Sequence, residues 1–492
     1  MKVFLQKTKA TVETACKTIN GHSLVVICYA LVVFVISGCS STTAFRAYPS
    51  KINPTITNLQ GKQQIDLDKL VAEERTSNDL ILYNMEYGRV AQMVGMPDKS
   101  ISAFNVAIDK IRVNDEKAII SASDIGAQMA AVSVNDNVIP YQGESYERVM
   151  LHHYQALNFL IKNKLEGAGV ESRQAGAEQN DALKRFEDEL EKVHKDAEAK
   201  NVNTDNSTVL TQYAQMDEIA GRVKNSFQNA YTFFLSGLIY ELLKQPNDAY
   251  IDYKKALEIF PQNKYLQKDV LRLANSLGMR EDVQSLSARF KLSTSASKQK
   301  AKAQGELIVL FEDGFVPQKK EVRIPLFIPK IGRIDMAFPI YKEKWSVPVA
   351  LSVSDDDAHI GSTETICDFR ALAVKSLQEK APAMATRQAL RAVAKATTKK
   401  QATDKLGLIG AIVADVYNVV SENADLRSWL TLPENAQIMR AFLPSGKHKL
   451  TLALQNNGAS TDVDVEIPPS GKTILYVIRA GGQFYKMVIP IE

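Results

Sequence analysis

The chain has few cysteines, tryptophans and histidines, and the shortage of cysteine limits its covalent chemistry. Its 492 residues include four Cys, two Trp and six His. Cys16, Cys28 and Cys39 lie near the start of the chain, so Cys367 stands alone in the remaining sequence. A single thiol cannot close an internal disulfide, even in an oxidising compartment. The sequence around Cys367 is strand-like, which favours a buried thiol over a nucleophile.

The sequence also lacks the linear motifs of common catalytic sites. It contains no HExxH zinc helix, no GxSxG nucleophile elbow and no catalytic Cys/His signature. Scattered residues can still assemble an active site that no linear motif reveals. The sequence therefore predicts a protein without catalytic residues, bound metal or cofactor.

A short apolar segment ends at Cys39. Residues 24–36 are apolar, four lysines precede them, and Ser37 and Gly38 separate them from Cys39. This segment is shorter than the roughly 20 residues that a transmembrane helix needs, and its basic-then-apolar order is typical of a secretory signal peptide. It resembles the lipobox of bacterial lipoproteins, which implies cleavage before Cys39 and attachment of diacylglycerol to its sulfur. The alternative is an uncleaved membrane anchor.

The lipobox resemblance predicts a signal peptide at 1–38 and, after it, a tether at 39–64. Removing residues 1–38 takes away four Lys and one Glu, so the formal net charge falls from +4 to +1. A near-neutral surface gives no electrostatic case for nucleic acid. In enterobacterial lipoproteins an Asp after the lipidated Cys is the usual inner-membrane retention signal. Ser40 stands there instead, so the resemblance implies the outer membrane, facing the periplasm.

Residues 231–261 match the tetratricopeptide (TPR) pattern, in which a pair of helices recurs every 34 residues. Gly237 and Ala249 would let two antiparallel helices approach, Tyr240 and Tyr253 would fill the space between them, and Pro261 would end the second helix. The full set of expected packing residues is Gly237, Tyr240, Ala249, Tyr253, Ala256 and Pro261.

Weaker copies of this spacing occur within 80–111 and around 151–175, and a partial or capping unit follows in 263–290. Because the copies are interrupted, we predict an irregular helical array over 65–290 rather than a long superhelix. A charged helix that opens at Asp181 is expected to be solvated.

The hydrophobic pattern changes from helical to alternating after a predicted linker at 291–305. Turn signals between the last four strand-like segments predict a meander, and a helical insertion is expected at 369–422. The predicted fold class is α+β, with a TPR-like helical array followed by a β-rich, sandwich-like domain over 306–492. The strand-like segments are 306–311, 321–325, 347–353, 447–454, 462–467, 473–478 and 484–489.

The insertion carries a basic stripe. Arg387, Arg391, Lys395 and Lys399 repeat every four residues and would share one helical face, before an apolar segment at 406–414. Two interpretations remain open. The stripe contacts anionic lipid or an acidic groove of a partner, or the helices pack on the sheet with solvated basic side chains.

Asp355, Asp356, Asp357 and His359 concentrate carboxylate and imidazole groups on a predicted loop. A divalent cation or another ligand could bind there, although the spacing is not that of an EF-hand. The alternative is an exposed acidic turn.

The segment from Asp425 to Pro433 closes the insertion. Its Trp429 is expected to act as a structural plug or as a ligand platform, with Asp425 and Arg427 paired at its edge. Together with Cys39 and the repeat at 231–261, this segment resembles a family of uncharacterised bacterial lipoproteins with tetratricopeptide repeats. That family has no assigned catalytic role, so the resemblance implies architecture and cellular address rather than activity.

Repeat arrays present concave surfaces to peptides and proteins. The sequence therefore predicts a non-catalytic scaffold that binds a protein partner through its helical half and the membrane through its lipid, with the β domain as a second docking surface and the oligomeric state left open. The alternatives are an activator of cell-wall (peptidoglycan) synthesis, and a glycan-binding or enzymatic β domain that uses the cluster at 355–359.

Overall fold

The computed structural model describes residues 48–61, 63, 65–67, 78–121, 139–199, 207–292, 304–328, 332–343, 345–420, 423–456 and 458–491. The predicted signal peptide, Cys39 and residues 293–303 of the predicted linker lie outside the described residues. Residues 52–492 form one compact unit. The chain is mixed helix and sheet, 54% helical and 24% strand, with helices first and most strands after them.

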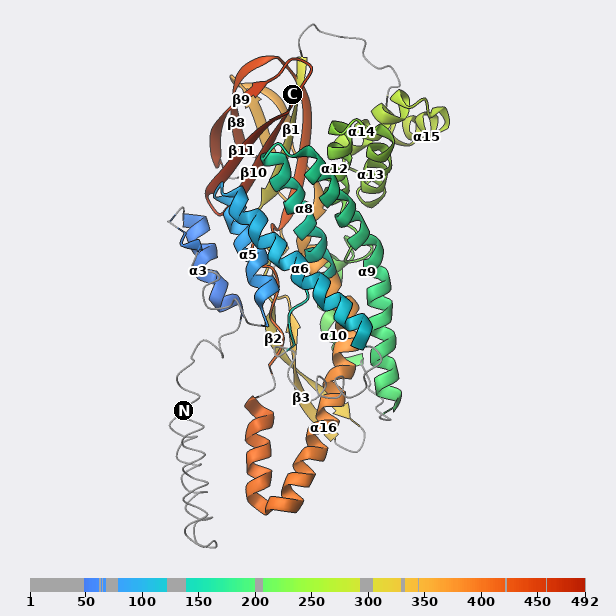
Figure 1. Ribbon diagram of the computed structural model, residues 1–492, viewed down its shortest axis with the longest axis vertical. Helices are drawn as coiled ribbons and strands as arrows, with labels where there is room; N and C mark the ends of the chain where they lie inside the picture. Colours follow the sequence, from blue (N-terminus) through green and yellow to red (C-terminus); the bar gives the residue numbers. More distant parts are fainter. Residues whose placement is uncertain are drawn as a thin grey trace. The chain divides into compact units, whose positions relative to one another are not determined.

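Most of the helices before the first strand are labelled in Figure 1. Their bounds are α3 (Tyr48–Gly61), α5 (Leu80–Met93), α6 (Pro97–Ser121), α8 (Ser145–Ile161), α9 (Leu165–Ala199), α10 (Ser207–Tyr213), η3 (Ala214–Met216), α11 (Asp217–Ala220), α12 (Ala230–Leu242), α13 (Pro246–Ile259), α14 (Lys264–Ser276) and α15 (Arg280–Phe290).

Helix α3 occupies part of the predicted tether, where no helix was expected. Ile52 and Leu59 lie two turns apart and are both fully buried, which places them on one helical face. The carbonyl of Leu59 accepts a hydrogen bond of 2.7 Å from the hydroxyl of Tyr485. Burial of this face explains the helix, despite Pro54 within it.

In the described part of the chain, four helix pairs share one turn geometry: α5 with α6, α8 with α9, α12 with α13, and α14 with α15. A left-handed residue follows each first helix, at Gly95, Asn163, Lys244 and Gly278. The next residue donates its N–H to the carbonyl five positions back, as in Met96 to Ala91. This is the Schellman motif. Positions 244 and 278 are 34 residues apart.

The strands follow the helices, with one long helix among them. Their bounds are β1 (Gln304–Asp313), β2 (Lys320–Ile328), β3 (Gly332–Ile340), β4 (Leu351–Asp355), β5 (Ala358–Ser362), β6 (Glu364–Asp368), β7 (Asn435–Pro444), β8 (Gly446–Leu454), β9 (Ser460–Ile467), β10 (Lys472–Ala480) and β11 (Gln483–Ile491), and α16 (Phe369–Val420) lies between β6 and β7.

Among the described residues, the strands form a five-stranded sheet, β11-β10-β1-β7-β6, a four-stranded sheet, β5-β4-β8-β9, and the hairpin β2-β3. The two larger sheets share one hydrophobic core, to which β1, β4, β7, β8, β9 and β10 all contribute. Side chains from their facing surfaces therefore pack as they do in a sandwich.

The predicted meander is wrong. Strands β8 and β9 pair in the four-stranded sheet, whereas β10 and β11 pair in the other one, where β10 runs parallel to β1. Pro468 and Pro469 separate β9 from β10. Because proline has no N–H to donate to a ladder, β9 ends there and the chain crosses to the other sheet.

Helices α5, α8, α12 and α14 pack on the outer face of the five-stranded sheet. At its centre, the guanidinium of Arg89 on α5 forms an ion pair with Glu312 on β1, and neither side chain is exposed. On β7, the strand next to β1, Arg440 pairs with Asp269 on α14 at 2.9 Å and with Glu241 on α12 at 3.1 Å. Buried charges therefore join the helices to the sheet.

The predicted insertion is helical, as α16 shows, but its basic stripe is not a solvated face. Arg391 is 4% exposed, and Arg387 forms an ion pair of 2.7 Å with Glu189 on α9. Packing of α16 against α9 turns the start of the stripe inward. The side chain of Lys399 and the apolar segment at 406–414 lie outside the described side chains.

The four helix turns make a matched pair of substitutions possible. Lys244 holds φ at 58°, a conformation that costs a non-glycine residue about 1 kcal/mol, so Lys244→Gly should raise the free energy of unfolding by up to that amount. Gly278→Ala should lower it by about 1 kcal/mol, since the left-handed turn penalises Cβ although no atom obstructs it. Urea unfolding of both variants measures the effect. Equal changes of the same sign in the free energy of unfolding of the two variants would contradict this prediction.

Candidate functional site

The repeat residues chosen from sequence are packing residues. A Cβ on Gly237 would lie 2.7 Å from the ring of Tyr253, so these helices approach closely. Ala249, Tyr253 and Ala256 are fully buried, and Tyr240 is nearly so. Pro261 follows the C-cap of α13, Phe260. The same close contact joins Gly88 to Phe104 in the first pair of helices.

The acidic cluster at 355–359 forms the β4-β5 hairpin turn. Asp355 pairs with Ala358 across the turn, and Asp356 and Asp357 have φ of 43° and 66°, as a two-residue hairpin turn of the primed type requires. The structure does not bring Asp355 and His359 together. Asp355 instead contacts Nδ1 of His448 on β8 at 2.6 Å, while His359 contacts Ser352 at 3.2 Å.

A shallow concavity lies beside this turn, lined by Asp355, Asp356, His448 and the neighbouring parts of β8 and β9. In the described residues, no group of three or more His, Cys, Asp or Glu side chains is placed to hold a metal ion. Asp357 and His359 do not line the concavity. The turn geometry accounts for the aspartates there.

The Trp429 loop, residues 425–433, is inserted between helices. Trp429 is fully buried and its ring packs edge-on against Phe104 at 5.9 Å and Tyr154 at 5.7 Å between centroids. Asp425 and Arg427 pair at 2.7 Å as predicted, and Arg427 also pairs with Asp79. The loop is therefore a plug that fills the core.

Two buried carboxylates hold the backbone of the Trp429 loop. Glu86 on α5 accepts hydrogen bonds from the N–H groups of Leu430 and Thr431, at 2.7 and 3.1 Å. Glu147 on α8 accepts one of 2.7 Å from the N–H of Trp429. Burial raises the pKa of Glu86 to about 7 and also raises the pKa of Glu147. Desolvation disfavours the charged forms more than these donors favour them.

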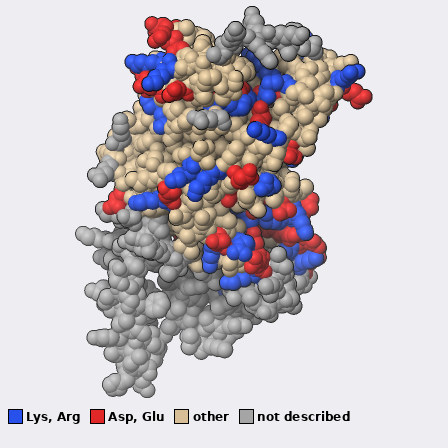
Figure 2. All heavy atoms as spheres, turned by 45° about the horizontal axis from the view of Figure 1, so that its top comes forward, with Lys and Arg blue, Asp and Glu red and all other residues tan. Residues whose placement is uncertain are grey.

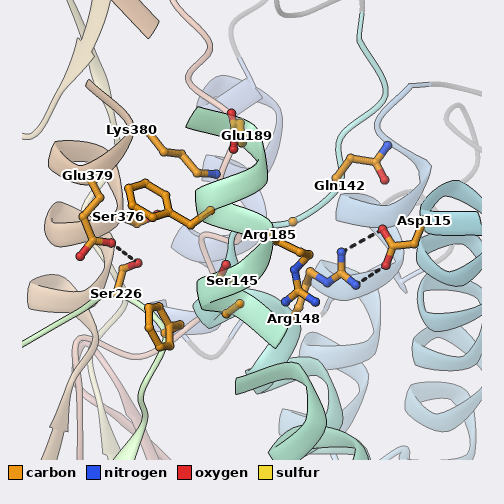
Figure 3. A pocket seen from close by; sticks show the side chains of 14 residues that line it. Asp115, Gln142, Ser145, Arg148, Arg185, Glu189, Ser226, Ser376, Glu379 and Lys380 are labelled. Atoms are coloured by element: carbon orange, nitrogen blue, oxygen red, sulfur yellow. Dashed lines mark hydrogen bonds and ion pairs between the residues drawn. The ribbon is translucent and has the colours of Figure 1, made fainter. Parts of the chain in front are cut away.

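A polar cleft of about 220 Å³ lies where α6, α8 and α9 meet α16. Figure 3 shows the Glu379–Ser226 hydrogen bond on one side of it, the Arg148–Asp115 ion pair on the other, and Arg185 between them in this view. The lining residues are Asp115, Gln142, Gly143, Ser145, Arg148, Ala182, Arg185, Phe186, Glu189, Ser226, Phe227, Ser376, Glu379 and Lys380.

Capped helices position the walls of this cleft. Helix α8 starts after Glu144. The N–H of Glu144 donates a hydrogen bond of 2.9 Å to the side chain of Glu147, as in a capping box. Asn229 caps α12 by accepting from Tyr231 and Thr232 at 3.0 and 3.3 Å. The cap at Asn229 fixes the end of the preceding loop, which carries Ser226 and Phe227 to the cleft.

Ion pairs hold most of the charges around the cleft. Arg148 pairs with Asp115 at 2.5 Å and with Glu178 at 2.9 Å. Lys380 pairs with Glu144 at 2.5 Å. Burial alone would raise the pKa of Glu144, but Lys380 and Lys319 outweigh it and hold that pKa well below its ordinary value. These pairs make the walls rigid and leave the lining close to neutral.

Sequence patterns did not reveal the cleft. Arg185 belongs to the charged helix that we expected to be solvated, yet it pairs with Glu178 at 2.6 Å. Arg148 lies in α8, and Glu379 and Lys380 lie in the insertion. Such residues meet only when α9 packs against α16, so no local signal identifies them.

Positive and negative side chains are intermixed on the face of the molecule that Figure 2 presents. Recognition on such a surface depends on local pairs of charges rather than on one broad potential. None of the helices in the described part of the chain combines the length and the apolar character that crossing a membrane requires.

Comparisons with protein family models, with curated proteins and with solved structures give no match for this chain. Function is therefore inferred from the geometry of the site.

The buried carboxylate of Glu86 predicts a pH-dependent stability. In the folded protein the pKa of Glu86 is about 7, above the ordinary 4.5. The stabilisation that its neutral form adds to the free energy of unfolding is therefore fully present below pH 4.5 and is lost as pH rises through 7. The Glu86→Gln variant cannot ionise at this position. Between pH 4.5 and 8, its free energy of unfolding should therefore rise relative to that of the wild type by on the order of 3 kcal/mol. Denaturant unfolding across this range measures the difference, with exposed Glu187→Gln as control. Parallel wild-type and Glu86→Gln profiles would contradict the assignment.

Proposed function

We propose that this chain is a lipid-anchored protein of the bacterial outer membrane that faces the periplasm and acts as a non-catalytic scaffold for a protein partner. Its helical part supplies the docking surface, and Cys39 supplies the membrane anchor. The observation that carries the proposal is the repetition of one helix pair along residues 80–290.

The four helix pairs support a TPR-like array. They share the Schellman turn, and two of the turns are 34 residues apart, which is the tetratricopeptide period. In two pairs a glycine on the first helix faces an aromatic ring on the second, at Gly88 and Gly237. Helical repeats of this kind commonly bind peptides and proteins.

The surface of the helical part offers sites for a partner. Val106 on α6, Val170 on α9 and Ile251 on α13 are large apolar side chains that are nearly half exposed. The polar cleft is lined by residues of α6, α8, α9 and α16. Exposed apolar side chains and a polar recess with fixed charges are both features of typical protein interfaces.

The anchor is tested by lipid labelling. Because only the sulfur of Cys39 would carry diacylglycerol, Cys39→Ser should abolish incorporation of a fatty-acid analogue and leave an unprocessed precursor. Gel mobility and fluorescence of the labelled protein measure both effects, and Cys28→Ser should label normally. Normal labelling of Cys39→Ser would reject the lipoprotein assignment.

The scaffold is tested by photo-crosslinking in cells with the full chain. A photoreactive amino acid at Val106 or Ile251 should give a discrete adduct with one partner protein, because both side chains are exposed on the helical part. The matched position is Phe327 on β2, which is 69% exposed and should give no such adduct. Adducts from Phe327 alone would move the docking surface to the strands.

A further inference from the structure

We propose that the polar cleft binds a dipolar peptide segment, one that carries a carboxylate and a basic group within a few residues of each other. This inference rests on the proposed scaffold function and names the chemistry that the partner presents. The two groups that would recognise the segment are the guanidinium of Arg185 and the carboxylate of Glu379.

The two arginines of the cleft differ in how much of their donor capacity is used. Arg148 is nearly buried and directs its Nε, Nη1 and Nη2 to Glu178 and Asp115 at 2.5 to 3.2 Å. Arg185 bonds to Glu178 through Nη2 alone. Within the described residues, Nε and Nη1 of Arg185 make no hydrogen bond, and the side chain is 32% exposed. Arg148 is thus structural, whereas Arg185 keeps donors for an incoming carboxylate.

Glu379 is the complementary group on the wall that α16 forms. Its Oε2 accepts a hydrogen bond of 2.6 Å from Ser226, which fixes the orientation of the carboxylate. In the described part of the chain, Glu379 makes no ion pair and its Oε1 has no hydrogen-bond partner. An oriented carboxylate that lacks a cation can accept from a lysine, an arginine or a terminal amine.

The charge balance of the cleft selects against other ligands. Arg148 and Lys380 are already neutralised by protein carboxylates, so a polyanion such as nucleic acid would have to displace those pairs. A neutral peptide or a sugar would remove water from Arg185 and Glu379 without supplying opposite charges, which carries a desolvation cost. A dipolar segment supplies both charges, and the half-buried rings of Phe186 and Phe227 can cover its apolar part.

The test uses the purified full-length lipoprotein on an array of end-blocked hexapeptides. One set holds one Asp or Glu and one Lys or Arg, separated by zero to three residues; the others are all-acidic, all-basic and uncharged. The dipolar set should be retained preferentially. Arg185→Gln and Glu379→Gln should each weaken retention at least tenfold, about the effect of one lost charge-assisted hydrogen bond.

Two substitutions serve as matched controls. Lys184→Gln and Glu187→Gln remove charges from exposed positions on the same helix as Arg185, so they should leave retention unchanged. Thermal unfolding of all four variants checks that they fold, and Arg185→Lys adds a variant that keeps the charge but loses the planar fork. We expect Arg185→Lys to be intermediate.

Several outcomes would overturn the assignment. If uncharged, all-acidic or all-basic peptides are retained as well as the dipolar set, the cleft does not select for a carboxylate and a basic group together. Binding to an oligosaccharide array that is lost in Arg185→Gln would identify a glycan site instead. If the photo-crosslinked partner persists undiminished in Arg185→Gln and Glu379→Gln, the scaffold function stands and the cleft is not its docking site. If no partner is crosslinked at all, the scaffold function itself fails.

Discussion

The fold depends on the buried ion pair between Arg89 and Glu312. Neither side chain is exposed, and removing two charges from water costs several kcal/mol for each ion unless partners surround them. The partners come from separate elements: Tyr154 on α8 donates to Glu312 at 3.2 Å, and Arg89 donates to Tyr476 on β10 at 2.7 Å. The pair is compatible with folding only when α5, α8, β1 and β10 occupy their final places together.

At two other points between the helices and the strands, buried charged or polar side chains also take their partners from separate elements. Glu86 and Glu147 hold the Trp429 loop through its backbone N–H groups, and Arg440 joins β7 to two helices. The inner faces of the helices are therefore committed to the sheet. A helical array that uses its inner face in this way differs from a free solenoid, whose neighbouring repeats contact only each other. The proposed partner would therefore dock on the outer faces or in the cleft.

The polar residues of the cleft fall into two groups. One group is held in ion pairs that stabilise the fold, and the other keeps hydrogen-bonding capacity for the proposed recognition. Arg148, Glu178 and Glu144 are engaged in pairs that fix α8, α9 and α16. Arg185 and Glu379 are oriented by single contacts and keep unused capacity. Preorganised side chains of this kind lose little conformational entropy when a ligand binds. The neutrality of the lining then makes the sign pattern of the ligand, rather than its net charge, the basis of selectivity.

The sequence alone determined most of the helices before the strands but not α3, and it determined the packing role of Gly237 and Tyr253, most strand segments and the helical insertion, because each of these has a local period or turn signal. It missed β7, a central strand that carries Arg440, since a buried arginine breaks the apolar pattern that marks a strand. It also placed Arg391 on an exposed face and the last four strands in one sheet. The pairing of β10 with β1 and the meeting of Arg185 with Glu379 join residues more than 150 positions apart. Only tertiary packing decided them, because burial and charge pairing are satisfied by contacts that no local stretch of sequence contains.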